Sequence, residues 1–517
     1  MFLFLSLASS QGLGSSSVQG AFGAVTIDGK IWNQVALRPI IPIGKVSVAL
    51  DIVFYIDQNG NIHDDEWDFS DGKKSKNSII DKIYYIRYGK KWDPFYFQVG
   101  ALDNITLGKG ILVNRYTNTI LYPQVRKVGM DIKFKFSGVN FYGFTNDFKE
   151  NLGLTGFRGS KNIINGINIG GSFVADRNQY LGLRDSDNDG RPDLVDDFPD
   201  DPLYWLDTDG DGIADVDPNE LDIDGDGVTD TLDNNIPGWD LDSIYVLDTD
   251  IMRKPEPLNV QNRKRSIYAV SLDASKTILA ESNMSVSIYA QFASLIGKTI
   301  DPISAEEVSL GNGFIPFGLS TKLGPARFKF EYRMMPSGKF EFGYWDRSYE
   351  IERATFSSSF MNDNSGLRTG EIITKDSRLG KFGKQKGYFS TLSIDLGEMV
   401  GASMSYQNLF GEQWNENESN FNNDRNQSFI AGIRLKKPIS KITNARWYYQ
   451  QRNVPNPFDF EFTESTISGY RVGIKLGNGM ILNYIFRQSF RDIDGDGKVN
   501  GKDETINMTS IETSFSF

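Results

Sequence analysis

Hydrophobic and polar residues alternate along most of this chain with a period of two. In residues 45–56 the even positions from Val46 to Ile56 are all apolar, while the odd positions include Ser47 and Asp51. Residues 131–136, 327–333 and 471–476 show the same alternation, with Lys or Arg facing one way and Phe, Tyr, Ile, Val or Leu the other. This period predicts β-strands and not helices.

Short and long connections alternate between the predicted strands. Residues 137–139, 323–325 and 477–479 are short links, whereas residues 58–81, 337–385 and 411–426 are expected to be long polar loops. Short turns on one side and long loops on the other are typical of outer-membrane barrels. A soluble sandwich with one wet face has the same period and is the alternative.

The end of the chain supports the barrel. Residues 511–517 alternate and finish in Phe517, which resembles the C-terminal strand of outer-membrane proteins. That resemblance implies recognition by the barrel-assembly machinery and contact with outer-membrane lipid. The expected fold is all-β, a transmembrane antiparallel β-barrel of about 18 to 20 strands. Counted back from Phe517, the strand directions place the long loops outside the cell.

Composition excludes other classes of membrane protein. The chain has 517 residues and no Cys, and its mean hydropathy is −0.36. A membrane-spanning helix needs about 18 or more consecutive apolar residues, and no such run exists. Without Cys there is no disulfide framework and no thiolate chemistry. Residues 1–20 begin with a short apolar stretch and resemble a secretory signal, although a basic first region is missing.

Charge divides the chain into a basic body and one acidic insert. Residues 185–250 hold 23 acidic side chains and a single basic one, Arg191, although the whole chain has a net charge of only −12. The expected organisation is therefore a signal-like segment at 1–20, barrel at 21–184, an Asp-rich module at 185–250 in a surface loop, and barrel at 251–517.

The acidic insert carries regularly spaced aspartates. Carboxylates at every second position of a tight loop, with Gly at the sixth, suit Ca²⁺, which takes six to eight oxygens. A disordered acidic linker is the alternative. The expected ligands are Asp185, Asp187, Asp189, Asp193 and Asp196 in the first loop, Asp207, Asp209, Asp211 and Asp215 in the second, and Asp222, Asp224, Asp226, Asp230 and Asp233 in the third.

These loops, with Phe198-Pro199-Asp200-Asp201-Pro202 and Trp205 between two of them, resemble thrombospondin type 3 repeats. The resemblance covers roughly residues 185–233. It implies that neighbouring repeats wrap a row of calcium ions with little apolar core. The second copy departs from the pattern, because its late acid is Asp217 and not the residue after it, which leaves its last ligand in doubt.

A fourth acidic loop lies near the end of the chain. Residues 492–503 resemble an EF-hand or dockerin calcium loop that joins two strands without flanking helices. A plain polar turn is the alternative. The expected ligands are Asp492, Asp494, Asp496, Lys498 through its backbone carbonyl, Asn500 and Asp503.

No enzymatic constellation is recognisable. The only histidine, His63, lies beside Asp64 and Asp65 in an expected loop, and no nucleophile can be assigned to it. Phosphate loops, zinc spacings, dinucleotide fingerprints and features of nucleic-acid binding are absent from the sequence. We therefore expect a protein that is not an enzyme.

The alternation also predicts a basic interior. Charged side chains facing lipid would be costly, so we expect the following residues to face the lumen: Lys133, Lys135, Arg327, Lys329, Arg333, Arg434, Lys436, Arg471 and Lys475. Rings of Arg or Lys favour anions. Two functions remain open: a pore for small solutes, anions among them, and a non-conducting surface scaffold or adhesion protein whose calcium-stiffened insert meets a partner.

Overall fold

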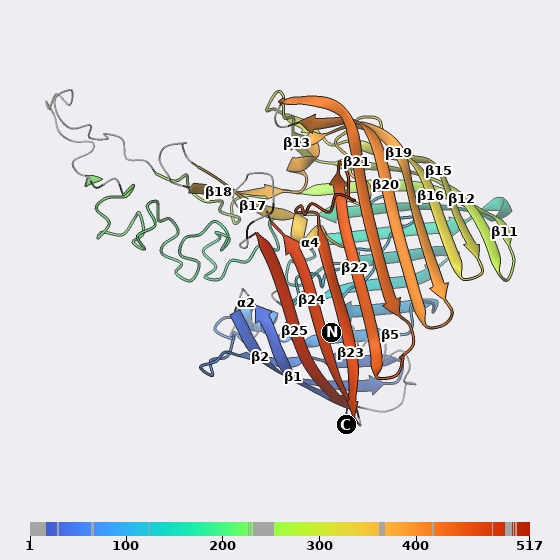
Figure 1. Ribbon diagram of the computed structural model, residues 1–517, viewed down its shortest axis with the longest axis horizontal. Helices are drawn as coiled ribbons and strands as arrows, with labels where there is room; N and C mark the ends of the chain where they lie inside the picture. The colour runs from blue at the N-terminus through green and yellow to red at the C-terminus, as the bar shows by residue number, and fades with distance from the viewer. Residues whose placement is uncertain are drawn as a thin grey trace.

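The computed structural model describes residues 17–516, apart from residues 28–29, 64–66, 124, 226, 228, 231–252, 361–367, 416–417, 478, 492–498, 500 and 502–503. Its body is one antiparallel sheet that closes on itself (Figure 1). The strands before the insert are β1 Ser17–Ile27, β2 Lys30–Ile43, β3 Val46–Leu50, β4 Ile52–Ile56, β5 Ile83–Tyr88, β6 Phe95–Gly100, β7 Gly129–Phe136, β8 Val139–Thr145, β9 Leu154–Asn162 and β10 Ile167–Asp176.

The sheet continues after the insert and closes where the last strand meets the first. Its strands there are β11 Ile267–Ala280, β12 Met284–Ile296, β15 Asn312–Leu323, β16 Ala326–Met335, β19 Phe382–Leu396, β20 Val400–Asn415, β21 Asn420–Leu435, β22 Ile442–Val454, β23 Ile467–Gly477, β24 Met480–Phe490 and β25 Thr505–Ser516. Strand β25 pairs with β1 from Ser516 opposite Gln19 to Ser510 opposite Val25. Since β3 and β4 are two parts of one strand, the closed barrel has 20 strands, as the alternation predicts.

Smaller elements lie in the connections. Among the described residues no helix is both long enough and apolar enough to cross a bilayer. These elements are the helices α2 Gly72–Asp81 and α4 Tyr349–Glu352, the 3-10 turns η1 Ile164–Gly166 and η3 Ser377–Lys381, and two hairpins, β13 Lys298–Ile300 with β14 Glu307–Ser309 and β17 Ala354–Phe360 with β18 Arg368–Thr374.

The barrel wall is apolar outside and polar inside. On β11, Val270 and Leu272 are 38% and 64% exposed, whereas Ser271 and Asp273, which point the other way, are 5% exposed. Strand β2 repeats this, with outward Leu37 exposed and inward Arg38 buried. This inside-out pattern is that of a barrel in lipid, where the outer band is apolar and the lumen polar.

The predicted connections are largely confirmed. Turns at Ser137-Gly138 and at Gly324 have positive φ and join adjacent strands tightly. One prediction is wrong: residues 411–426 are mostly strand, because β20 and β21 stay paired from Gly411 opposite Asp424 to Asn415 opposite Asn420. Backbone hydrogen bonds hold this hairpin together. Its side chains therefore need no apolar alternation, which is why the sequence pattern indicates a loop.

Two further boundaries differ from the expectation. Strand β1 begins at Ser17, inside the segment expected to resemble a secretory signal up to residue 20. The strand expected over residues 45–56 is interrupted at Asp51, whose backbone N–H donates to the carbonyl of Lys82. The Asp51 carboxylate accepts from Arg38 at 2.7 Å and from Arg126 at 2.8 Å, so a buried ion pair replaces regular pairing there.

Two long connections fold into the lumen. The first inner loop is residues 101–128, between β6 and β7, and the second inner loop is residues 336–353, after β16. They pair side by side, because the N–H of Trp345 donates to the carbonyl of Leu112 and the N–H of Asn114 donates back to the carbonyl of Trp345. Their apolar side chains form one buried cluster with the inner wall, so the barrel contains a packed plug.

Candidate pore lining and calcium-binding insert

Cavities remain between the plug and the barrel wall. Three adjoining cavities, of about 130, 290 and 280 Å³, all border on Arg347 of the second inner loop. A fourth cavity of about 570 Å³ shares Thr106 and Lys109 with the third. The plug therefore leaves a series of neighbouring spaces along its side.

Seven of the nine basic residues expected to face the lumen border these cavities. Arg471 lines the first cavity, Arg327 and Arg434 the second, Lys329 and Arg333 the third, and Lys133 and Lys135 the fourth. Lys436 pairs with Asp395 of the second cavity at 2.7 Å. Lys475 lies on β23 four residues after Arg471, hence on the same face of the strand.

Sequence reasoning missed seven arginines that border the same spaces, namely Arg38, Arg115, Arg158, Arg347, Arg446, Arg452 and Arg487. Arg446 lies on β22, where the aromatic residues Trp447, Tyr448 and Tyr449 occupy both faces and hide the alternation, and Arg487 lies on β24. Arg115 and Arg347 come from the inner loops, in which no periodic pattern marks the residues that face a cavity. Positive charge in the lumen is thus greater than the strand pattern alone predicts.

Acidic side chains near these arginines are mostly engaged already. Glu512 accepts from Arg38 at 3.1 Å, and Asp395 pairs with Lys436 at 2.7 Å and with Arg327 at 3.6 Å. Asp103 also borders the first two cavities. The first cavity has five arginines against two acids in its lining, and so does the second.

Two buried ion networks fasten the second inner loop. In the first network, Arg353 contacts Glu150 at 3.0 Å, Glu350 at 3.2 Å and Asp176 at 3.5 Å, while Lys127 contacts Glu350 at 2.6 Å. Burial alone would raise the pKa of Glu350, but Lys127 and Arg353 lower it to about 2. The first network therefore stays ionised at neutral pH.

The second network joins the same loop to β22 and to the segment after β18. Arg452 contacts Glu341 and Asp346, each at 2.7 Å, and Lys375 contacts Glu352 at 2.7 Å. Burial works against the charge of Glu352, yet Lys375 and Arg452 lower its pKa to about 2. Between them, the two networks pair Glu350, Glu352 and Arg353 with opposite charges.

The Asp-rich insert extends from the same rim as the β17–β18 hairpin, away from the barrel (Figure 1). Its three loops repeat one hydrogen-bond pattern. In each, the first Asp accepts from the N–H of the Gly five residues later, as Asp185 does from Gly190 at 3.1 Å. The other two pairs are Asp207 with Gly212 at 2.9 Å and Asp222 with Gly227 at 3.0 Å.

Backbone geometry explains the residues at the fourth and sixth positions of the loops. Gly190, Gly212 and Gly227 all have φ between 92° and 97°, a region that side chains disfavour. The fourth positions also have positive φ and are occupied by Asn188, Gly210 and Gly225, residue types that tolerate this conformation. The local structure thus accounts for the repeated sequence before any metal is considered.

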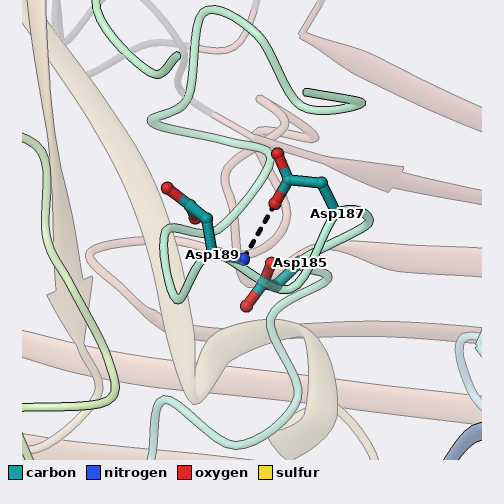
Figure 2. A group of neighbouring side chains, drawn as sticks. All are labelled: Asp185, Asp187 and Asp189. Carbon is teal, nitrogen blue, oxygen red and sulfur yellow. Dashed lines mark hydrogen bonds between the residues drawn. The ribbon is translucent and has the colours of Figure 1, made fainter. Parts of the chain in front are cut away.

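Carboxylates converge in the first two loops. Oxygens of Asp185, Asp187 and Asp189 lie within 4.8 Å of one another (Figure 2). The same holds for oxygens of Asp207, Asp209 and Asp211. Asp193 and Asp215 instead accept hydrogen bonds with both oxygens, from Ser186 and Thr208 respectively. Their role in the structure is to close the loop.

The donor set fits a hard divalent cation. Asp185, Asp187, Asp196 and Asp222 each have one buried carboxylate oxygen without a hydrogen-bond partner among the described residues. Burial, followed by the charges of Asp189 and Asp187, raises the pKa of Asp196 to about 6, and burial likewise raises the pKa of Asp185 to about 6. A cation would satisfy these oxygens and remove the repulsion.

Several expected ligands lie outside the described residues. These are Asp226, Asp233, and the whole ligand set of the fourth loop, namely Asp492, Asp494, Asp496, Lys498, Asn500 and Asp503. The base of that loop is described: the N–H of Arg491 donates to the carbonyl of Glu504 at 2.9 Å. His63 packs edge-on against Trp32, with ring centroids 4.8 Å apart.

Comparison with known proteins yields distant structural similarity only. No family model and no curated protein matches the chain. Among solved structures, OccK10 (OpdN) of Pseudomonas aeruginosa has a TM-score of 0.36 at 7% identity, over 98% of this chain and 99% of that one. OccK5 (OpdH) of the same organism gives 0.35 at 8%, over 97% of both chains. OccAB2 of Acinetobacter baumannii gives 0.35 at 7%, over 97% and 98%.

Proposed function

We propose that this chain is an outer-membrane pore for small anionic solutes, with a calcium-binding insert at the cell surface. The outer-membrane location is supported by the closed wall, which is apolar outside and polar inside. The wall leaves no unpaired edge in lipid, and closure is what a membrane-spanning sheet requires.

The observation that carries the pore is the series of basic cavities beside the plug. Each cavity shares lining residues with the next, and arginine and lysine side chains border all four. In a narrow space of low dielectric, such a lining attracts anions and repels cations. A barrel of 16 or more strands is wide enough for a lumen even with loops folded inside.

Selective conductance tests the pore. We expect the refolded full chain in a planar bilayer to give small discrete current steps, with a reversal potential in a KCl gradient that favours chloride by about threefold or more. Selectivity should weaken at high salt, because salt screens the arginines. Cation selectivity, or an anion selectivity that does not weaken at high salt, would contradict the proposal.

The plug supports a second candidate, a non-conducting surface scaffold. Apolar residues of both inner loops are fully buried against the wall, Trp345 and Tyr116 among them, as in a structural core. In this alternative the insert would bind a partner at the cell surface once calcium orders it. Absence of current together with calcium-dependent binding of the protein to cells would favour the scaffold.

Calcium binding by the insert is proposed on the repeated loops, and the thrombospondin type 3 resemblance agrees with it. Bound calcium would supply the positive charge that balances the converging carboxylates. The proposed ligands are Asp185, Asp187, Asp189 and Asp196 in the first loop and Asp207, Asp209 and Asp211 in the second. Extracellular calcium modules typically bind at about 10⁻⁴ to 10⁻³ M, which suits a structural ion.

A further inference from the structure

The wall next to the second inner loop carries arginines in directly opposed positions. Arg434 on β21 lies opposite Arg446 on β22, and Arg446 lies opposite Arg471 on β23. On β24, Ile485 is the residue opposite Arg471, so Arg487, two positions along, is a diagonal neighbour of Arg471. Like charges directly opposite one another destabilise a sheet, and a negative charge placed among them would offset that repulsion.

The plug adds two more arginines to the same place. Arg347 borders the three cavities around it, and Arg115 borders two of them. Burial and the charge of Arg446 lower the pKa of Arg347, and the same two causes lower that of Arg115. Arg115 also has a φ of 60°, an uncommon conformation for a residue with a side chain.

Most of these arginines lack an ionic partner. Among the described residues no ion pair and no side-chain hydrogen bond is made by Arg115, Arg347, Arg471 or Arg487. Arg471 is only 9% exposed, and its buried Nε has no hydrogen-bond partner in the described part of the chain. Arginine cannot shed its charge in a protein, so burial without a partner is costly.

The ring of Tyr448 lies beside two of these arginines and lines the first two cavities. Its ring lies 5.2 Å from the Arg347 guanidinium and 5.9 Å from that of Arg446. The residues opposite Tyr448 on both neighbouring strands are glycines, Gly432 and Gly469. A Cβ on Gly469 would come within 2.6 Å of the Tyr448 hydroxyl, so the missing side chain makes room for the ring.

We propose that Arg115, Arg347, Arg446, Arg471 and Arg487 form a binding site for a polyvalent oxyanion at the junction of the cavities. The proposal rests on the proposed pore and names the class of solute it selects. A monovalent anion would leave most of this charge uncompensated, whereas clustered phosphate-type oxygens can accept from several guanidinium groups at once. Of the acids that line the first two cavities, Glu512 already pairs with Arg38 and Asp395 with Lys436, which leaves Asp103 with a single negative charge.

Calorimetry on the full chain in detergent tests the site, with inorganic pyrophosphate as the probe and acetate as a monovalent comparison. We expect one pyrophosphate per chain, bound about a hundredfold or more tighter than acetate. Arg347→Gln should weaken pyrophosphate binding about tenfold or more, because it removes charged hydrogen bonds to the anion. Arg487→Gln, on a wall strand, should act in the same direction.

Lys135→Gln is the matched control, because it removes one positive charge from the fourth cavity and leaves the arginines in place. Folding of each variant is checked by its heat-dependent gel mobility, and if Arg347→Gln fails to fold, Arg487→Gln decides. Pyrophosphate binding no tighter than acetate would overturn the site. Equal losses in Arg487→Gln and Lys135→Gln would also overturn it, because general lumen charge would then explain the binding.

The outcome separates the site from the pore. A protein that binds pyrophosphate but carries no current keeps the oxyanion site and contradicts the proposed pore. A protein that conducts anions without binding pyrophosphate keeps the pore and overturns the site.

Discussion

Replacing Arg353 with Met should raise the single-channel conductance about twofold or more, since the plug would no longer be held in a lumen of this width. Arg353 is 2% exposed and contacts three carboxylates, those of Glu150, Glu350 and Asp176. Removing one partner of a buried ionic network costs about 3–5 kcal/mol, because the remaining charges stay buried without compensation. Movement of the second inner loop out of the lumen relieves that cost.

The same network sets the expected response to acid. The pKa of Glu350 is lowered by Lys127 and Arg353 to about 2, below its usual value, despite burial. A carboxyl with a lowered pKa stabilises the folded plug above its ordinary pKa, and the stabilisation is lost as the pH falls towards 2. Glu350 should therefore cause no change in wild-type conductance from pH 7 down to about pH 5.

Bilayer recordings check the prediction, with Arg177→Met as the control. Arg177 is exposed at the base of the insert, and the one side-chain hydrogen bond described for it is a long one of 3.5 Å to the carbonyl of Asn151. Its replacement should leave conductance unchanged. A folded Arg353→Met protein with the wild-type current would show that the ionic network does not hold the plug.

Removing calcium should make the insert sensitive to protease and leave the barrel resistant. Without a cation, the converging carboxylates of Asp185, Asp187 and Asp189 repel one another across less than 4.8 Å. Since the loops have little apolar core, we expect EGTA to raise the rate of cleavage within residues 185–230 about tenfold or more. Strands paired through the whole barrel should remain uncut.

Limited proteolysis followed by mass spectrometry measures the rate of cleavage. One substitution within the insert tests the role of the carboxylates, and a second one serves as its control. Asp187→Asn removes a converging carboxylate and should raise cleavage even with calcium present. Asp200→Asn makes the same change of charge at an exposed residue between the first two loops, outside both carboxylate clusters, and should have no effect. Cleavage that ignores both EGTA and Asp187→Asn would contradict a calcium-organised insert.

Most of the barrel could be predicted because its strands obey one simple rule. Each strand has one face towards lipid and one towards the lumen. Apolar and polar residues therefore alternate along it, and this pattern reveals the strand in the sequence even where the turns are short. The rule fails where a strand leaves that boundary. Residues 411–426 carry no apolar face, yet they pair as strands, because a hairpin beyond the wall is held by its backbone.

The plug, and with it Arg115 and Arg347, could not be predicted for a different reason. Leu112 and Trp345 meet through the fold of two loops more than two hundred residues apart, and loops have no period that shows which side faces inward. Arg347 is therefore indistinguishable from a solvent-exposed loop residue in the sequence. By contrast, the Asp loops are local, and their spacing alone predicts the convergence seen for Asp185, Asp187 and Asp189.

The strands differ greatly in length around the barrel. Strands β20 and β21 have 16 residues each, and β5 and β6 have six. At about 3.4 Å per residue, the former extend over about 54 Å and the latter over about 20 Å. The barrel wall is thus much taller along β20 and β21 than along β5 and β6, the strands that lead into the first inner loop. In the proposed pore, the low side of the wall gives a solute a shorter path to the basic cavities than the tall side does.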